Sequence, residues 1–221
     1  MDYLNIEADK LKGIGALDTA KEISGQPELW VDVFHKLMLE RKEISEFLKS
    51  TLYKTKKIIL TGAGTSAYIG FSVEGAMQRN TGINTYSVAT THLVTHPQDY
   101  FEKDTPTLLI SFARSGNSPE SVAAAKFADK YCLNCYHLII TCNKDGDLAR
   151  FSSKNKNLVF LLPPNSNDKS LAMTGSYTGM LLAAILLSDF DNLDTKESTI
   201  NTLVEYSKVL LYQRLKDVKN I

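Results

Sequence analysis

The spacing of hydrophobic residues changes along this chain. Over residues 28–49 they recur every three or four positions, as in Leu29, Val33 and Leu37, which is typical of an amphipathic helix. Beyond Lys57 they form short uninterrupted runs that end at glycine or at polar turns. Five runs predict buried strands: 57–61, 83–88, 107–112, 136–141 and 158–162.

Helical patterns separate these strands. Residues 65–79 and 120–130 follow the first and third strands, and two further helices are predicted over 171–187 and 195–217. Short apolar strands that alternate with helices indicate a parallel sheet covered on both faces. The predicted fold class is therefore α/β, a three-layer αβα arrangement around a five-stranded parallel sheet.

The composition and charge of the chain argue against nucleic acid and membranes as binding partners. The 221 residues have a formal net charge of zero and a pI near 6.9, whereas a nucleic-acid-binding protein needs a basic stripe. The longest apolar run, 179–187, is too short for a membrane span, and the N-terminus MDYLNIEADK lacks the layout of a signal peptide. We expect a cytoplasmic protein that binds neither nucleic acid nor membrane.

The first strand ends in the loop Thr61-Gly62-Ala63-Gly64-Thr65-Ser66. The two glycines allow a sharp turn and a close approach of the backbone to a ligand. Thr65 and Ser66 place hydroxyl groups at the start of the next helix, where unpaired amides and the helix dipole attract a phosphate.

A second loop of this kind, Arg114-Ser115-Gly116-Asn117-Ser118, follows the third strand. Pro119 suits the first position of a helix, which makes Ser118 the predicted N-cap. Either loop alone is also what an ordinary helix start looks like. Two of them in successive strand-to-helix turns favour a shared phosphate site, with Arg114 adding a positive charge.

Two cofactor motifs are disfavoured. Residues 62–67 fit the dinucleotide fingerprint G-x-G-x-x-A, but no Asp or Glu lies between Glu74 and Asp99 to hold the ribose, and neither loop contains the P-loop lysine. Cys132 and Cys135 have CxxC spacing without the second pair that a zinc site needs. We expect no cofactor and no metal.

The two serine loops together resemble those of a known protein family. Gly64-Thr65-Ser66 together with segment 114–118 resembles the sugar isomerase (SIS) domain, which has a flavodoxin-like parallel sheet and binds phosphorylated sugars. Segments 19–30 and 170–174 resemble one branch of it, the tagatose-6-phosphate ketose/aldose isomerases, also described as galactosamine-6-phosphate deaminases.

The resemblance implies roles for particular residues. The phosphate would be held by Gly64, Thr65, Ser66, Arg114, Ser115, Asn117 and Ser118. Asp168 and Thr174 would lie near the sugar. The catalytic base is not identified, because Asp168 and Glu120 are candidates by position alone and each is also an ordinary acid at a helix start.

The resemblance also predicts the domain organisation. Members of this branch resemble two SIS domains in tandem, so the chain is expected to supply the first: a helical arm at 1–50, the domain at 51–192, and a helix at 193–221 leading towards a second domain that this sequence lacks. The expected activity is isomerisation or deamination of a sugar phosphate; a non-catalytic sugar-phosphate sensor is the alternative.

The apolar helix at 171–187 suggests a homo-oligomer.

Overall fold

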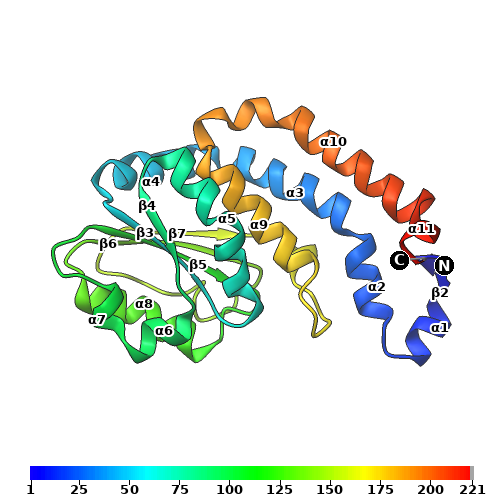
Figure 1. The fold of residues 1–221 in the computed structure, drawn as a ribbon, viewed down its shortest axis with the longest axis horizontal. Coiled ribbons are helices and arrows are strands. Elements are labelled where there is room, and N and C mark those ends of the chain that lie inside the picture. Colours follow the sequence, from blue (N-terminus) through cyan, green and yellow to red (C-terminus); the bar gives the residue numbers. More distant parts are fainter. Residues whose placement is uncertain (220–221) are drawn as a thin grey trace.

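A five-stranded parallel sheet forms the centre of the computed structural model, which describes residues 1–219 (Figure 1). Its strands are β3 (Lys57–Gly62), β4 (Asn84–Ser87), β5 (Thr107–Ala113), β6 (Cys135–Thr141) and β7 (Asn157–Leu161). All five predicted strands are confirmed to within two residues at each end.

The strand order brings the loops after β3 and β5 together at the carboxyl ends of the strands. The order is β4-β3-β5-β6-β7, so the chain first moves outward from β3 to β4 and then returns to the other side of β3. This is the flavodoxin-like order, and ligands bind such sheets at the carboxyl ends of the strands where the direction reverses. Gly62 of β3 pairs in register with Phe112 of β5, so the loops that follow these strands start side by side.

Helices cover both faces of the sheet (Figure 1). One face carries α3 (Gln26–Leu39), α4 (Arg41–Thr51), α5 (Thr65–Thr81) and α9 (Gly175–Ser188). The other carries α6 (Thr90–Thr95), α7 (Pro97–Tyr100) and α8 (Pro119–Tyr131). Successive strand residues alternate between the faces: Ile58 and Leu60 join the first core, and Ile59 joins the second. The predicted three-layer fold is confirmed.

The helix predicted at 28–49 is two helices. The chain bends at Glu40, where φ is −91° and ψ is 9°, and the Glu40 side chain pairs with Lys36 Nζ at 2.5 Å. The two apolar stripes, through Leu37 on α3 and Ile44 on α4, still reach the same core. The helical pattern over 28–49 and its buried face are therefore confirmed, and the structure adds the break at Glu40.

The chain starts with a small hairpin that the sequence did not reveal. Strands β1 (Asp2–Tyr3) and β2 (Ile6–Glu7) pair antiparallel around Leu4 and Asn5, which have positive φ values of 55° and 58°. Such two-residue turns usually contain glycine, so Leu-Asn gave no signal. Helices α1 (Ala8–Gly13) and α2 (Leu17–Ser24) follow the hairpin.

The helix predicted at 195–217 is interrupted. A 3₁₀ segment, η3 (Phe190–Lys196), leads into α10 (Glu197–Lys208), and a π-helical turn, η4 (Val209–Gln213), separates α10 from α11 (Leu215–Lys219). Ile200 and Val204 of α10 are buried in the same core as α3. The amphipathic pattern therefore reports a real packing face over the first half of this segment.

Candidate phosphate site

A hollow of about 100 Å³ lies between the carboxyl ends of β3 and β5, the place where the strand order reverses. Residues from both predicted loops line it, together with the last two residues of β5, Ser121 of α8, and Met173, which lies two residues before α9. The lining residues are Ala63, Ser66, Phe112, Ala113, Arg114, Ser115, Gly116, Ser118, Ser121 and Met173. Four of the ten are serines, so hydroxyl groups are the main chemistry of this surface.

The first loop brings Ser66 to the hollow. A Cβ on Gly62 would lie 2.6 Å from the backbone carbon of Ser66, so only glycine lets β3 pass this closely beneath the start of α5. Gly64, with φ of 56°, is the N-cap of α5. Ser66 is 4% exposed, and its Oγ lies 3.8 Å from Met173 Sδ. Thr65 is exposed, and neither it nor Gly64 lines the hollow.

The second loop contributes Ser115 and Ser118. Helix α8 begins at Pro119 with Ser118 at the N-cap, as predicted. The Ser118 side chain makes no capping hydrogen bond, which leaves its hydroxyl free for a ligand. Because α5 and α8 both start at the hollow, the positive ends of two helix dipoles favour an anion here.

A third loop supports the second one from behind. Asn143 Nδ2 donates to Ser115 O at 2.9 Å, and the backbone N–H of Leu148 donates to Gly116 O at 3.0 Å. Asn117 Oδ1 accepts a hydrogen bond from the N–H of Asp147 at 3.0 Å. The Asn117 side chain is therefore engaged with this support loop, residues 143–148, and does not line the hollow.

Residues 168–174, which we call the strap, close another side of the hollow. Arg114 Nη1 donates to Ser170 O at 2.8 Å. From the opposite side, Glu22 Oε1 of α2 accepts hydrogen bonds from the N–H groups of Lys169 at 2.6 Å and Ser170 at 3.1 Å. Arg114 thus lines the hollow while anchoring the strap, and Met173 of the strap contacts Ser66.

The Asp168 side chain stabilises the N-terminus of α9. Its Oδ2 accepts hydrogen bonds from the N–H groups of Thr174 and Ser176, both at 2.9 Å, and from Ser176 Oγ at 2.5 Å. These contacts hold the strap in a non-helical path and delay α9 to Gly175, four residues later than predicted. Thr174 is the N-cap residue. Neither Asp168 nor Thr174 lines the hollow.

Comparison with known proteins agrees with this geometry. The family model of the SIS domain matches residues 51–187, which contain the whole sheet and both serine loops. The chain belongs to the SIS domain family.

Longer relatives resemble this SIS chain over 87–100% of its length. A D-galactosamine-6-phosphate deaminase, AgaS, from Shewanella sp. (strain ANA-3) is 40% identical over 98% of this chain and 56% of its own. A Clostridium novyi NT structure with the proposed assignment tagatose-6-phosphate ketose/aldose isomerase has a TM-score of 0.95 at 39% identity, covering 100% of this chain and 57% of its own. The Escherichia coli tagatose-6-phosphate ketose/aldose isomerase has a TM-score of 0.80 at 38% identity, covering 87% and 54%. The chain spans a little over half the length of these relatives.

The SIS site offers no acid or base of its own at the hollow. Among the residues that line it, within the described part of the chain, there is no Asp, Glu or His. Cys142 follows the neighbouring strand β6, but burial raises the pKa of its thiol to about 12, so it stays protonated near neutral pH. The described lining residues therefore offer donors for an anion but no carboxylate or imidazole group.

Two lining residues and one supporting residue were missed in the sequence. Ser121 lies three residues beyond the predicted loop, and Met173 lies in a segment that was interpreted as helix. Glu22 lies on α2, nearly 150 residues away from the strap. The only signal for Glu22 was its place in the segment that resembles the isomerase branch.

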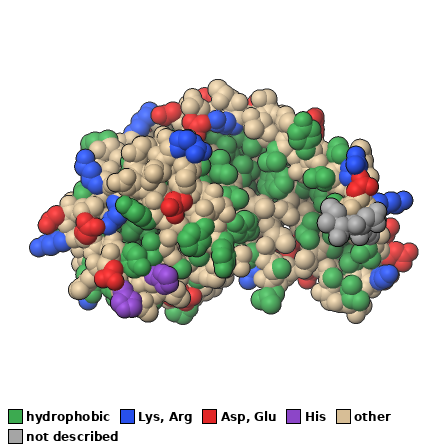
Figure 2. Space-filling model, viewed as in Figure 1, with side chains coloured by type: hydrophobic (Ala, Val, Ile, Leu, Met, Phe, Trp, Pro, Cys, Tyr) green, Lys and Arg blue, Asp and Glu red, His purple; other side chains and the backbone are tan. Residues whose placement is uncertain are grey.

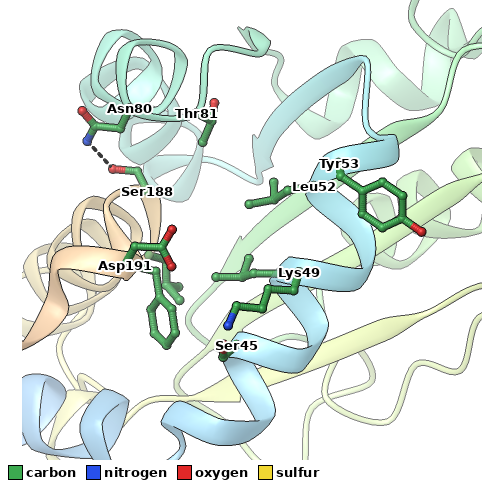
Figure 3. A pocket seen from close by; sticks show the side chains of 11 residues that line it. Ser45, Lys49, Leu52, Tyr53, Asn80, Thr81, Ser188 and Asp191 are labelled. Carbon is green, nitrogen blue, oxygen red and sulfur yellow. Dashed lines mark hydrogen bonds between the residues drawn. The ribbon is translucent and has the colours of Figure 1, made fainter.

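A larger groove, of about 390 Å³, lies between α4, the end of α5 and the end of α9 (Figure 3). Lys49 and Asp191 stand on opposite walls, and Asn80 Nδ2 donates to Ser188 Oγ at 2.9 Å across one end. It is next to Tyr53 and Thr81, which precede β3 and β4, so it faces the amino ends of the strands. Ligand sites of this sheet type lie at the carboxyl ends.

Two other kinds of site are absent from residues 1–219. No group of three or more His, Cys, Asp or Glu side chains is arranged to hold a metal ion among these residues. None of their helices combines the length and the apolar character that crossing a bilayer requires.

Proposed function

We propose that this chain binds the phosphate group of a phosphorylated sugar, of the galactosamine 6-phosphate or tagatose 6-phosphate type. The observation that carries the proposal is the convergence of Ser66, Ser115 and Ser118 on one hollow at the starts of α5 and α8. Hydroxyl donors and helix N-termini are a typical phosphate-binding combination. The activities named for the longer relatives supply the class of sugar.

The whole reaction is proposed to be sugar-phosphate isomerisation or deamination, with this chain holding the phosphate. Phosphate contacts far from the reacting carbons fix the substrate in register. The proton transfer at C2 needs a base within hydrogen-bond reach. Since no acidic or histidine side chain lines the hollow in the described residues, that base is expected from outside the hollow, and residues 193–221 are proposed to lead towards a second domain.

Phosphate-dependent binding should be lost when the serines are removed. Calorimetric titration of the chain with galactosamine 6-phosphate should show binding, and Ser66→Ala and Ser115→Ala should each weaken it roughly 10- to 100-fold, because a hydrogen bond to a charged group contributes about 1.5–3 kcal/mol. Exposed Ser198 on α10 provides the matched control, Ser198→Ala, which should bind as the unchanged chain does.

Two ligands test the specificity of the site. Unphosphorylated galactosamine should not bind measurably, because the hollow recognises the phosphate. NAD should not bind either, and NAD binding without phosphosugar binding would refute the proposal.

An ammonia-release assay on the same samples distinguishes a deaminase from the second candidate, a non-catalytic sensor. The lack of acidic lining residues favours the sensor for the chain alone.

Self-association is part of the proposal. Large apolar side chains remain at the surface: Tyr68 and Phe71 of α5 are 62% and 59% exposed, and Tyr206 of α10 is 68% exposed. Figure 2 shows hydrophobic side chains gathered over α9 and between α3 and α10. Sedimentation velocity should therefore show dimers or larger species at high protein concentration; a monomer throughout the concentration series would contradict this expectation.

A further inference from the structure

Ser121 has a buried hydroxyl group without a hydrogen-bond partner. Its side chain is 3% exposed, and its Oγ contacts neither a donor nor an acceptor in the described chain. The large majority of buried side-chain polar atoms in proteins do find a partner. The same side chain lines the phosphate hollow. An unpaired hydroxyl at the wall of a proposed ligand site suggests that the ligand is the missing partner.

The position of Ser121 in α8 explains why its hydroxyl group finds no acceptor within the helix. Serine and threonine within helices usually donate to the carbonyl group four residues earlier, as Thr51 does to Phe47 O at 2.8 Å. Ser121 is the third residue of α8, so the residue four positions earlier, Asn117, lies in the loop before the helix. The backbone of Ser121 is satisfied, because its N–H donates to Ser118 O at 2.9 Å.

We propose that Ser121 is a fourth hydroxyl ligand of the bound phosphate, beside Ser66, Ser115 and Ser118. This inference rests on the proposed function and adds a preference for phosphate over carboxylate ligands. A phosphate ester has three terminal oxygens that accept hydrogen bonds, whereas a carboxylate has two. Four hydroxyl donors around one small hollow therefore favour a sugar phosphate over a sugar acid of similar size.

The test compares two variants that each remove one unpaired buried hydroxyl. Ser121→Ala should weaken the binding of galactosamine 6-phosphate, and of inorganic phosphate, about 10-fold or more in calorimetric titration. The midpoint of its thermal unfolding without ligand should stay unchanged or rise, because no hydrogen bond within the protein is lost. Thr61→Val is the matched control: Thr61 Oγ1 is also buried, at 1% exposure, and has no partner within residues 1–219, but Thr61 does not line the hollow.

The outcomes separate this inference from the proposed function. Weakened phosphate binding in Ser121→Ala, with unchanged binding in Thr61→Val, would support it; the preference for galactosamine 6-phosphate over galacturonate should also fall. Equal binding by Ser121→Ala and the unchanged chain, alongside weakened binding by Ser66→Ala, would overturn the inference and leave the proposed function standing. No binding of either phosphate compound by the unchanged chain would overturn both.

Discussion

Replacement of Gly146 by alanine should destabilise the protein by about 3 kcal/mol and weaken phosphosugar binding about 100-fold. A Cβ at this position would lie 2.4 Å from Ser115 O and 3.1 Å from the Gly116 Cα. Both atoms belong to the backbone, so no side chain can rotate away to make room. The support loop must then separate from the serine loop.

The separation breaks the contacts that place Ser115 and Ser118. The hydrogen bonds from Asn143 Nδ2 to Ser115 O and from the Leu148 N–H to Gly116 O are lost first. With both serines displaced, two hydrogen bonds to the phosphate are lost, at about 1.5 kcal/mol each. Urea denaturation measures the stability, and titration with galactosamine 6-phosphate measures the binding.

A second glycine variant controls for the added methyl group. Gly75 lies within α5, and a Cβ there would have no neighbour within 4 Å. Gly75→Ala should raise stability by about 1 kcal/mol through helix propensity and leave binding unchanged. Normal phosphosugar binding by Gly146→Ala would show that the support loop does not position the serines.

The second large effect is expected at Asp168. Asp168→Ala should lower the free energy of unfolding by about 3–4 kcal/mol, because three donors to Oδ2 lose their acceptor at the start of α9. Asp168→Asn keeps one acceptor oxygen in nearly the same shape and should lose about half as much. Chemical denaturation of both variants gives the comparison.

This experiment also separates two roles for the Asp168 carboxylate. A residue that only contacted the sugar would change binding and leave the stability of the free protein unaltered. Asp104→Ala removes an acid that is exposed in the structure and lies far along the chain from the strap, and it should change neither quantity. Full stability in Asp168→Ala would contradict the capping role and return Asp168 to the sugar side of the site.

Several features of the site could be predicted because local sequence determines them. Pro119 tolerates only the first turn of a helix, which located Ser118 at its N-cap. Gly62 and Gly64 predicted a sharp turn after β3, and the structure adds that Gly62 is needed for the close approach of β3 to the backbone of Ser66. The helix boundary at residue 171 was missed because the Asp168 side chain, rather than the apolar pattern, decides where α9 begins.

The sequence by itself determined the class of the fold, since strands buried on both faces must be apolar without interruption and their turns must tolerate tight backbone geometry. It also placed Ser66, Ser115 and Ser118 at strand ends. Only the tertiary structure decided which side chains meet across the chain. Glu22 holds the strap from a helix far away in sequence, and Ser121 is unpaired because of where α8 begins. Periodicity marks which face of a helix is buried, but it does not say which distant residue that face or its polar neighbours will meet.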